Sequence, residues 1–81
     1  MNIGKAITAL KNKDKVYRKG WNGRGMWLVM FDCNMYTLEG YSQLDFPPYI
    51  GFKTAQNTIV AWCPSQTDIL ADDWEILKED N

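Results

Sequence analysis

The sequence predicts an α+β domain, in which an N-terminal helix packs on a small antiparallel sheet of about five strands and a short helix precedes the last strand. Apolar side chains recur at helical spacing near the start of the chain, and five later stretches are rich in β-branched and aromatic residues. Most of these stretches follow one another across turns or irregular loops. Strands joined in this way pair antiparallel, because a parallel pair needs a long, usually helical, crossover.

The length of 81 residues fits one domain spanning residues 1–81. A chain of this size removes only roughly 60 % of its unfolded surface from water, so a single copy is expected to be marginally stable. Four Trp, four Tyr and three Phe give it a heavy aromatic content. These rings either fill a small dense core or serve a ligand or a second subunit. We therefore expect self-association.

The N-terminal helix is predicted from an apolar face that repeats with a helical period. Asn2 is the expected N-cap, and the helix is expected to end near Lys11–Asn12. The apolar face consists of Ile3, Ala6, Ile7 and Leu10.

Two strands are expected at residues 16–21 and 26–31, with the sequence WNGRG between them. Asn-Gly is the strongest short hairpin signal, because both central residues of the favoured turn need positive φ. Residues 32–48 show no periodicity and predict a long irregular loop that ends at Pro47-Pro48. Loops of this length in small domains are typically functional or interfacial.

A second hairpin is predicted from strands at residues 49–54 and 58–62, with Asn57 in a left-handed turn. Ser65 and Asp68 then form a capping-box pattern, which predicts the start of a short helix. Residues 74–77 complete the sheet as its last strand.

The charges are unevenly distributed, although the net charge is only −1. The basic side chains among the first 25 residues are Lys5, Lys11, Lys13, Lys15, Arg18, Lys19 and Arg24. The acidic side chains after Gln66 are Asp68, Asp72, Asp73, Glu75, Glu79 and Asp80. We expect these two regions to pair, within one chain or between two subunits. The nearly neutral total argues against binding to a nucleic-acid polymer.

Several kinds of chemistry are excluded by composition. The chain has no histidine, and its two cysteines, Cys33 and Cys63, are far apart. Ser-His-Asp and Cys-His catalytic units are therefore impossible, and His-based or paired-Cys metal sites are too. We expect a binding module without catalytic residues, metal or cofactor. The charged start and the lack of an apolar run near ~18 residues predict a cytoplasmic protein with no membrane contact.

The segment from Trp21 to Gly25 has two interpretations. An indole plane, glycine N–H groups and a guanidinium could together hold a nucleotide, because purines stack on Trp and tight turns bind phosphate oxygens. Alternatively, the segment is a hairpin turn whose Trp packs in the core. The segment SQTD has the same ambiguity, since its polar side chains could contact a ligand or simply cap a helix.

The runs KVYRKGWNGRGMWL, PPYIGFKTA, IVAW and SQTDILADDWEIL closely resemble a family of very small phage and prophage proteins, the second anti-Thoeris family. The resemblance covers nearly the whole chain except residues 32–46. It implies a protein that binds and sequesters cyclic ADP-ribose-type immune signals (gcADPR-like) of the bacterial Thoeris system without degrading them. It also implies a homo-oligomer, a tetramer or dimer of dimers with pockets between protomers, in the cytoplasm of the infected or lysogenic host.

Combining the residue patterns with the resemblance gives a set of candidate ligand-binding residues: Trp21, Asn22, Gly23, Arg24, Gly25, Gln66, Thr67 and Asp68. In this hypothesis Trp21 stacks on the adenine. The pyrophosphate is held by Gly23, Arg24 and Gly25, and the ribose hydroxyls by Asn22, Thr67 and Asp68. Two alternatives remain open: a sponge for cyclic di- or trinucleotide signals, and a protein-interaction module that blocks a host defence factor.

Overall fold

The computed structural model describes residues 1–21, 25–31 and 47–78. The elements, in chain order, are α1 (Ile3–Lys11), β1 (Val16–Arg18), β2 (Trp27–Phe31), β3 (Tyr49–Lys53), β4 (Ile59–Ala61), α2 (Gln66–Leu70) and β5 (Trp74–Ile76). This order confirms the predicted α+β class, including the short helix before the last strand. Most of the predicted 32–48 loop, residues 32–46, lies outside the described residues. No helix among the described residues is both long and apolar enough to cross a membrane.

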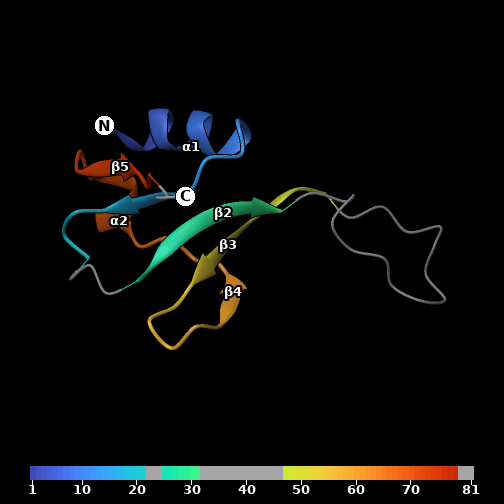
Figure 1. Cartoon of the computed structure of the whole chain (residues 1–81). Helices are drawn as coiled ribbons and strands as arrows, with labels where there is room; N and C mark the ends of the chain where they lie inside the picture. Colours follow the sequence, from blue (N-terminus) through green and yellow to red (C-terminus); the bar gives the residue numbers. More distant parts are fainter. Residues whose placement is uncertain (22–24, 32–46, 79–81) are drawn as a thin grey trace, which may run out of the picture.

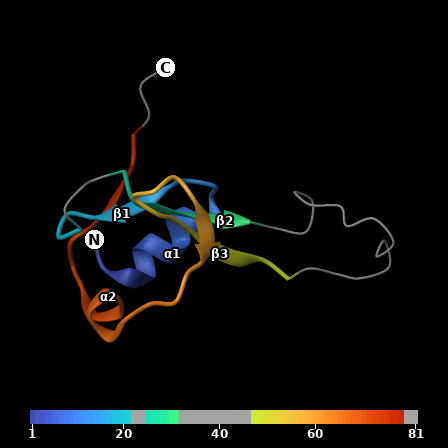
Figure 2. The same ribbon diagram turned by 90° about the horizontal axis from the view of Figure 1, so that it is seen from below.

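The five strands form one antiparallel sheet in the order β4-β3-β2-β1-β5, so the last strand of the chain pairs with the first. The helix α1 lies across one face and contacts β5, β1, β2 and α2 (Figure 1; Figure 2). The backbones of β3 and β4 lie farther from the helix. One part of the sheet is therefore covered by the helix, whereas the part that continues to the β4 edge is not.

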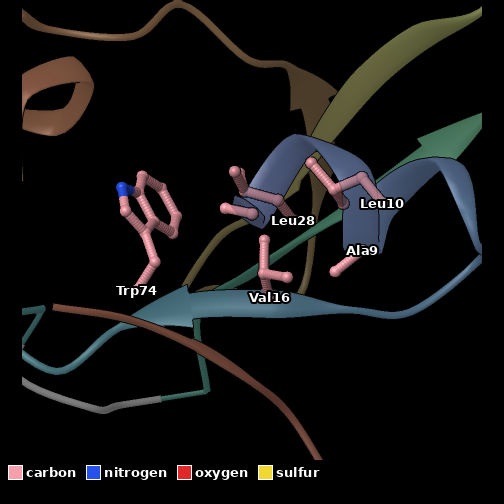
Figure 3. Packing of buried hydrophobic residues seen from close by; sticks show 6 residues of the cluster. Ala9, Leu10, Val16, Leu28 and Trp74 are labelled. Atoms are coloured by element: carbon pink, nitrogen blue, oxygen red, sulfur yellow. The ribbon is translucent and has the colours of Figure 1, made fainter. Parts of the chain in front are cut away.

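The core lies between α1 and the covered part of the sheet. Leu10, Val16, Leu28 and Trp74 are its largest fully buried side chains. They come from α1, β1, β2 and β5, and their side chains converge beneath the helix (Figure 3). Among these fully buried side chains, Trp74 is the one with a large ring. Its size helps so short a chain to form a continuous apolar interior.

Both helix starts are the ones that the sequence predicts. The Asn2 side chain accepts a hydrogen bond from Lys5 N, which caps α1. At α2, Ser65 Oγ accepts from Asp68 N, while Asp68 Oδ2 accepts from Ser65 N, so the capping box is complete. Asn57 adopts the expected left-handed conformation, with φ of 63°.

The first strand is shorter than expected. It ends at Arg18 rather than at Trp21, because the backbone after Lys19 leaves the ladder with β5. Lys19 N donates to Asp73 O, and Gly20 N donates to a side-chain oxygen of Asp73. Trp21 N then closes a turn on Arg18 O. The chain therefore turns before Asn22-Gly23, and residues 22–24 lie outside the described residues.

The opposite face of the sheet depends on a close approach between Phe31 and Gly51. The Phe31 ring packs beside Tyr49, with ring centroids 5.3 Å apart, and lies over the backbone of Gly51. A Cβ atom at Gly51 would lie 2.8 Å from Phe31 Cδ2 and closer still to Cε2. Only glycine leaves room for the ring here.

We expect Gly51→Ala to destabilise the protein by about 1–3 kcal/mol, the usual cost of forcing extra atoms into a packed site. Gly4→Ala is the matched control, because its Cβ would lie in open helix surface, 3.5 Å from Asn2 Oδ1. That change should be neutral or stabilise α1 by up to ~1 kcal/mol. Urea unfolding of both variants measures the effect, and equal stabilities would contradict the packing role of Gly51.

Candidate functional site

Two of the predicted site segments, which are far apart in the sequence, lie together in the structure. The indole Nε1 of Trp21 donates a hydrogen bond to Asp68 Oδ1 over 3.4 Å. Trp21 follows β1 and Asp68 lies on α2, so the contact joins the first motif to the second. Trp21 and Asp68, which the sequence places in two separate candidate segments, are therefore in direct contact.

The ring of Trp21 is half-buried and sits in a row of aromatic side chains. It meets Phe52 and Trp74 edge-on, with centroid distances of 5.5 and 5.3 Å. Trp62 approaches the other side of this row, 5.8 Å from Trp74. Trp21 therefore packs partly against the core, as one of the two interpretations predicts, and part of its ring reaches the surface.

Asp68 is the polar centre of the region. Its Oδ1 accepts from Arg18 Nη1 at 2.9 Å as well as from the Trp21 indole. Its main-chain oxygen accepts from Trp74 Nε1 at 3.0 Å. Oδ2 accepts from Ser65 N, and a carboxylate oxygen has a second lone pair. Asp68 therefore organises its neighbours and still has acceptor capacity for a hydroxyl group.

Asp73 makes the second half of the network, around the same arginine. Its Oδ1 accepts from Arg18 Nε at 2.8 Å, and its Oδ2 accepts from Gly20 N at 2.9 Å. The side chains of Arg18 and Asp68 are each 15 % exposed, and that of Asp73 is 32 % exposed. Ion pairs that are this well covered and hydrogen-bonded hold geometry far better than exposed pairs do.

The network shifts the pKa values of its acids. Burial alone would raise the pKa of Asp68, but hydrogen bonds from Arg18, Ser65 and Trp21 outweigh it and lower the pKa below its usual value. The pKa of Asp73 is lowered chiefly by its hydrogen bond from Arg18, and that of Arg18 is raised by both acids. All three groups are therefore firmly charged at neutral pH.

The remaining predicted site residues are distributed around this network. Gln66 and Thr67 are exposed on α2, and Gln66 helps to line a hollow of about 290 Å³. Gly25 is exposed with a φ of 74°, and its carbonyl accepts from Lys53 Nζ at 2.6 Å. Asn22, Gly23 and Arg24 lie outside the described residues. No described residues form a cluster of three or more His, Cys, Asp or Glu that could hold a metal.

Three residues with these contacts were not predicted from the sequence. They are Arg18 and Asp73, which pair with each other, and Lys53, which contacts Gly25. The charge asymmetry predicted that basic and acidic regions pair, and the contacts Arg18–Asp68, Arg18–Asp73 and Lys19–Glu75 show this within one chain. No local signal identified which acid would meet which base. The contact of Lys53 with Gly25 depends on the β2–β3 pairing, in which Lys53 lies opposite Trp27.

An apolar groove of about 590 Å³ lies between α1, α2 and strands β2 and β3 of the sheet. Its lining includes Ile7 of α1, Met30 and Ile50 of the sheet, and Ile69 of α2. Ile69, which lines the groove, is 43 % exposed, and an exposed apolar groove typically marks an interaction site.

Comparison with known proteins identifies the family to which the chain belongs. The model of the Thoeris anti-defense 2-like domain matches residues 1–77, which is nearly the whole chain. The protein named Thoeris anti-defense 2 from Bacillus phage SP01 is 40 % identical over an alignment of 85 positions, covering 96 % of each chain. The match extends across both motif segments and the sheet between them.

The network should make stability depend on acid pH. Because the folded-state pKa values of Asp68 and Asp73 are lowered, their contribution is present above the ordinary aspartate value of about 3.9 and is lost as the pH falls through the folded-state values. We expect a melting temperature that is nearly constant from pH 7 to pH 5 and falls below about pH 4.

Asp73→Asn should lower the melting temperature at pH 7 and flatten its decline in acid. Asp72→Asn, which changes the same charge at the exposed neighbouring position, is the control and should keep the wild-type decline. Scanning calorimetry across this pH range measures both. An acid profile that Asp73→Asn leaves unchanged would contradict the role of the ion pair.

Proposed function

The chain belongs to the Thoeris anti-defense 2-like family, and we propose that it binds and sequesters a cyclic ADP-ribose-type signal of the Thoeris system without cleaving it. Family membership supports a phage anti-Thoeris function. The observation that carries the ligand-binding proposal is the contact of Trp21 with Asp68, which places a partly exposed indole beside a carboxylate with spare acceptor capacity.

The chemistry around Trp21 suits an adenine nucleotide. An indole plane stacks a purine with roughly 1–3 kcal/mol. Asp68 and the exposed Thr67 and Gln66 offer hydrogen-bonding groups for ribose hydroxyls on the adjacent helix. The groups around Trp21 therefore match the base and the sugar of such a signal.

The same groups support the proposal that the signal is bound without being cleaved. The chain has no histidine, and the lowered pKa values of Asp68 and Asp73 keep them ionised at neutral pH. A carboxylate of this kind is a poor proton donor and a weak base, whereas general acid–base catalysis needs a pKa near the working pH. The groups therefore suit recognition, and the ligand would remain intact in the cytoplasm of the infected or lysogenic host.

The affinity that sequestration requires favours a pocket made by more than one chain. A competitor for a signal near ~100 nM needs a dissociation constant of about 10 nM or lower, roughly −11 kcal/mol. An open surface with one stacking ring reaches this with difficulty, because water weakens each polar contact. The apolar groove between α1, α2 and the sheet offers a surface on which a second copy can close the site.

Calorimetry with a panel of cyclic ADP-ribose isomers tests the proposal. We expect saturable heat with at least one isomer, and recovery of that ligand intact after the complex is denatured. Heat with cyclic di- or trinucleotides alone would show that the protein sequesters those signals instead. If no nucleotide gives heat and the protein forms a stable complex with a host defence protein, it acts by blocking that protein.

Trp21→Ala should weaken binding about ten- to a hundredfold, since it removes the stacking surface. Because Trp21 also contacts Phe52 and Trp74, Trp21→Phe is the milder variant and should bind with intermediate affinity. Trp27→Ala is the matched control, since Trp27 is also half-buried but lies beside Lys15. Equal losses at Trp21 and Trp27 would exclude a specific role for Trp21.

The oligomer is tested by sedimentation equilibrium. We expect the wild type to be larger than a monomer and Ile69→Lys to weaken association, because it places a charge in the apolar groove. Ile76→Lys is the control at the opposite edge of the sheet, with a similar exposure of 40 % against 43 %. A monomeric wild type would contradict the proposal that a second copy completes the pocket.

A further inference from the structure

Among the described residues, Arg18 is the one whose side chain bonds to the carboxylates of both Asp68 and Asp73. Its guanidinium donates through Nη1 to Asp68, and through Nε and Nη2 to Asp73. These contacts join β1 to α2 and to the residue that precedes β5. Three of its five N–H donors are engaged within the protein, and the side chain is only 15 % exposed. This arrangement suits a structural anchor better than a group that captures a phosphate.

Each acid that Arg18 binds holds a different part of the segment entering the candidate site. Asp68 accepts the Trp21 indole, so it sets the orientation of the ring. Asp73 accepts from Gly20 N through its side chain and from Lys19 N through its main-chain oxygen. Through these two acids, Arg18 connects the contacts on both sides of residues 19–21. The Trp21 indole and the backbone beside it are therefore fixed together.

The fit at Gly20 shows how closely the backbone and the acid approach. A Cβ atom at Gly20 would lie 2.9 Å from Asp73 Oδ2, and 3.5 Å from Arg18 Nη2. A side chain there would push the carboxylate away from the arginine. The absence of one allows the main chain to lie directly against the ion pair.

We propose that Arg18 is a positioning residue for signal binding: through Asp68 and Asp73 it fixes Trp21 in its binding orientation before the ligand arrives. The inference rests on the proposed function, because it takes Trp21 as the stacking surface. Ordering a side chain or loop upon binding weakens affinity, and a ring that is already fixed avoids this loss. Arg18 acts through the acids and does not itself contact the signal.

The test compares Arg18→Met with Lys19→Met. Both changes remove one positive charge from adjacent positions, but Lys19 pairs with Glu75 in an exposed contact and touches neither Asp68 nor Asp73 through its side chain. Binding of the cyclic ADP-ribose isomer with the largest heat is measured by calorimetry at a temperature at which circular dichroism shows each variant fully folded. Amide hydrogen exchange of Gly20 and Trp21 is measured without ligand.

We expect Arg18→Met to weaken binding about tenfold or more, because the ring must then be ordered by the ligand. Exchange at Gly20 should accelerate about tenfold beyond any change at Leu10 in the core, as expected for local rather than global opening. Lys19→Met should bind within about threefold of the wild type, as exposed ion pairs contribute little. Arg18→Lys should also weaken binding, because a single ammonium cannot span both acids.

Other outcomes separate the positioning role of Arg18 from the proposed binding of the signal. If the wild type binds and folded Arg18→Met binds as tightly as Lys19→Met, the positioning role is wrong and the proposed function stands. A purely structural arginine would give this result, with a lower melting temperature but unchanged affinity. If the wild type binds no member of the panel, the proposed function fails and the positioning inference fails with it.

Discussion

The ion-pair network of Arg18, Asp68 and Asp73 is the interaction on which the candidate site depends. It connects the end of β1 to α2 and to the start of β5, although Arg18 is 50 and 55 residues away from the two acids. Its charges are largely covered, and their hydrogen-bonding groups are directed at one another. Without it, Trp21 and α2 would be joined mainly by packing against Trp74.

The size of the domain explains why the candidate site shares its residues with the packed interior. The core has few large side chains, and Trp74 is the largest of those that are fully buried. Trp21, Phe52 and Trp62 extend this core outwards as a row of edge-on aromatic contacts. The outer part of that row, which belongs to the candidate site, therefore packs on the interior and shares its rigidity.

Local signals predicted the parts of the fold that depend on neighbouring residues. The Asn2 cap, the Ser65–Asp68 capping box and the left-handed Asn57 all follow from interactions within a few positions. The end of β1 at Arg18 did not, because Gly20 N leaves the ladder and donates to the side chain of Asp73, which is 53 residues away in the sequence. Asp68 was predicted as a site residue, but its partner Arg18 was identifiable only through the pairing of β1 with β5.

The central claim is that the Trp21 indole forms part of the surface that holds the signal. The most direct test follows the indole N–H signals in a ¹⁵N-labelled protein during titration with a cyclic ADP-ribose isomer that gives calorimetric heat. The account predicts that the Trp21 signal moves the most, and that the Trp27 signal stays in place. A saturated complex in which the Trp21 signal has not moved would contradict it.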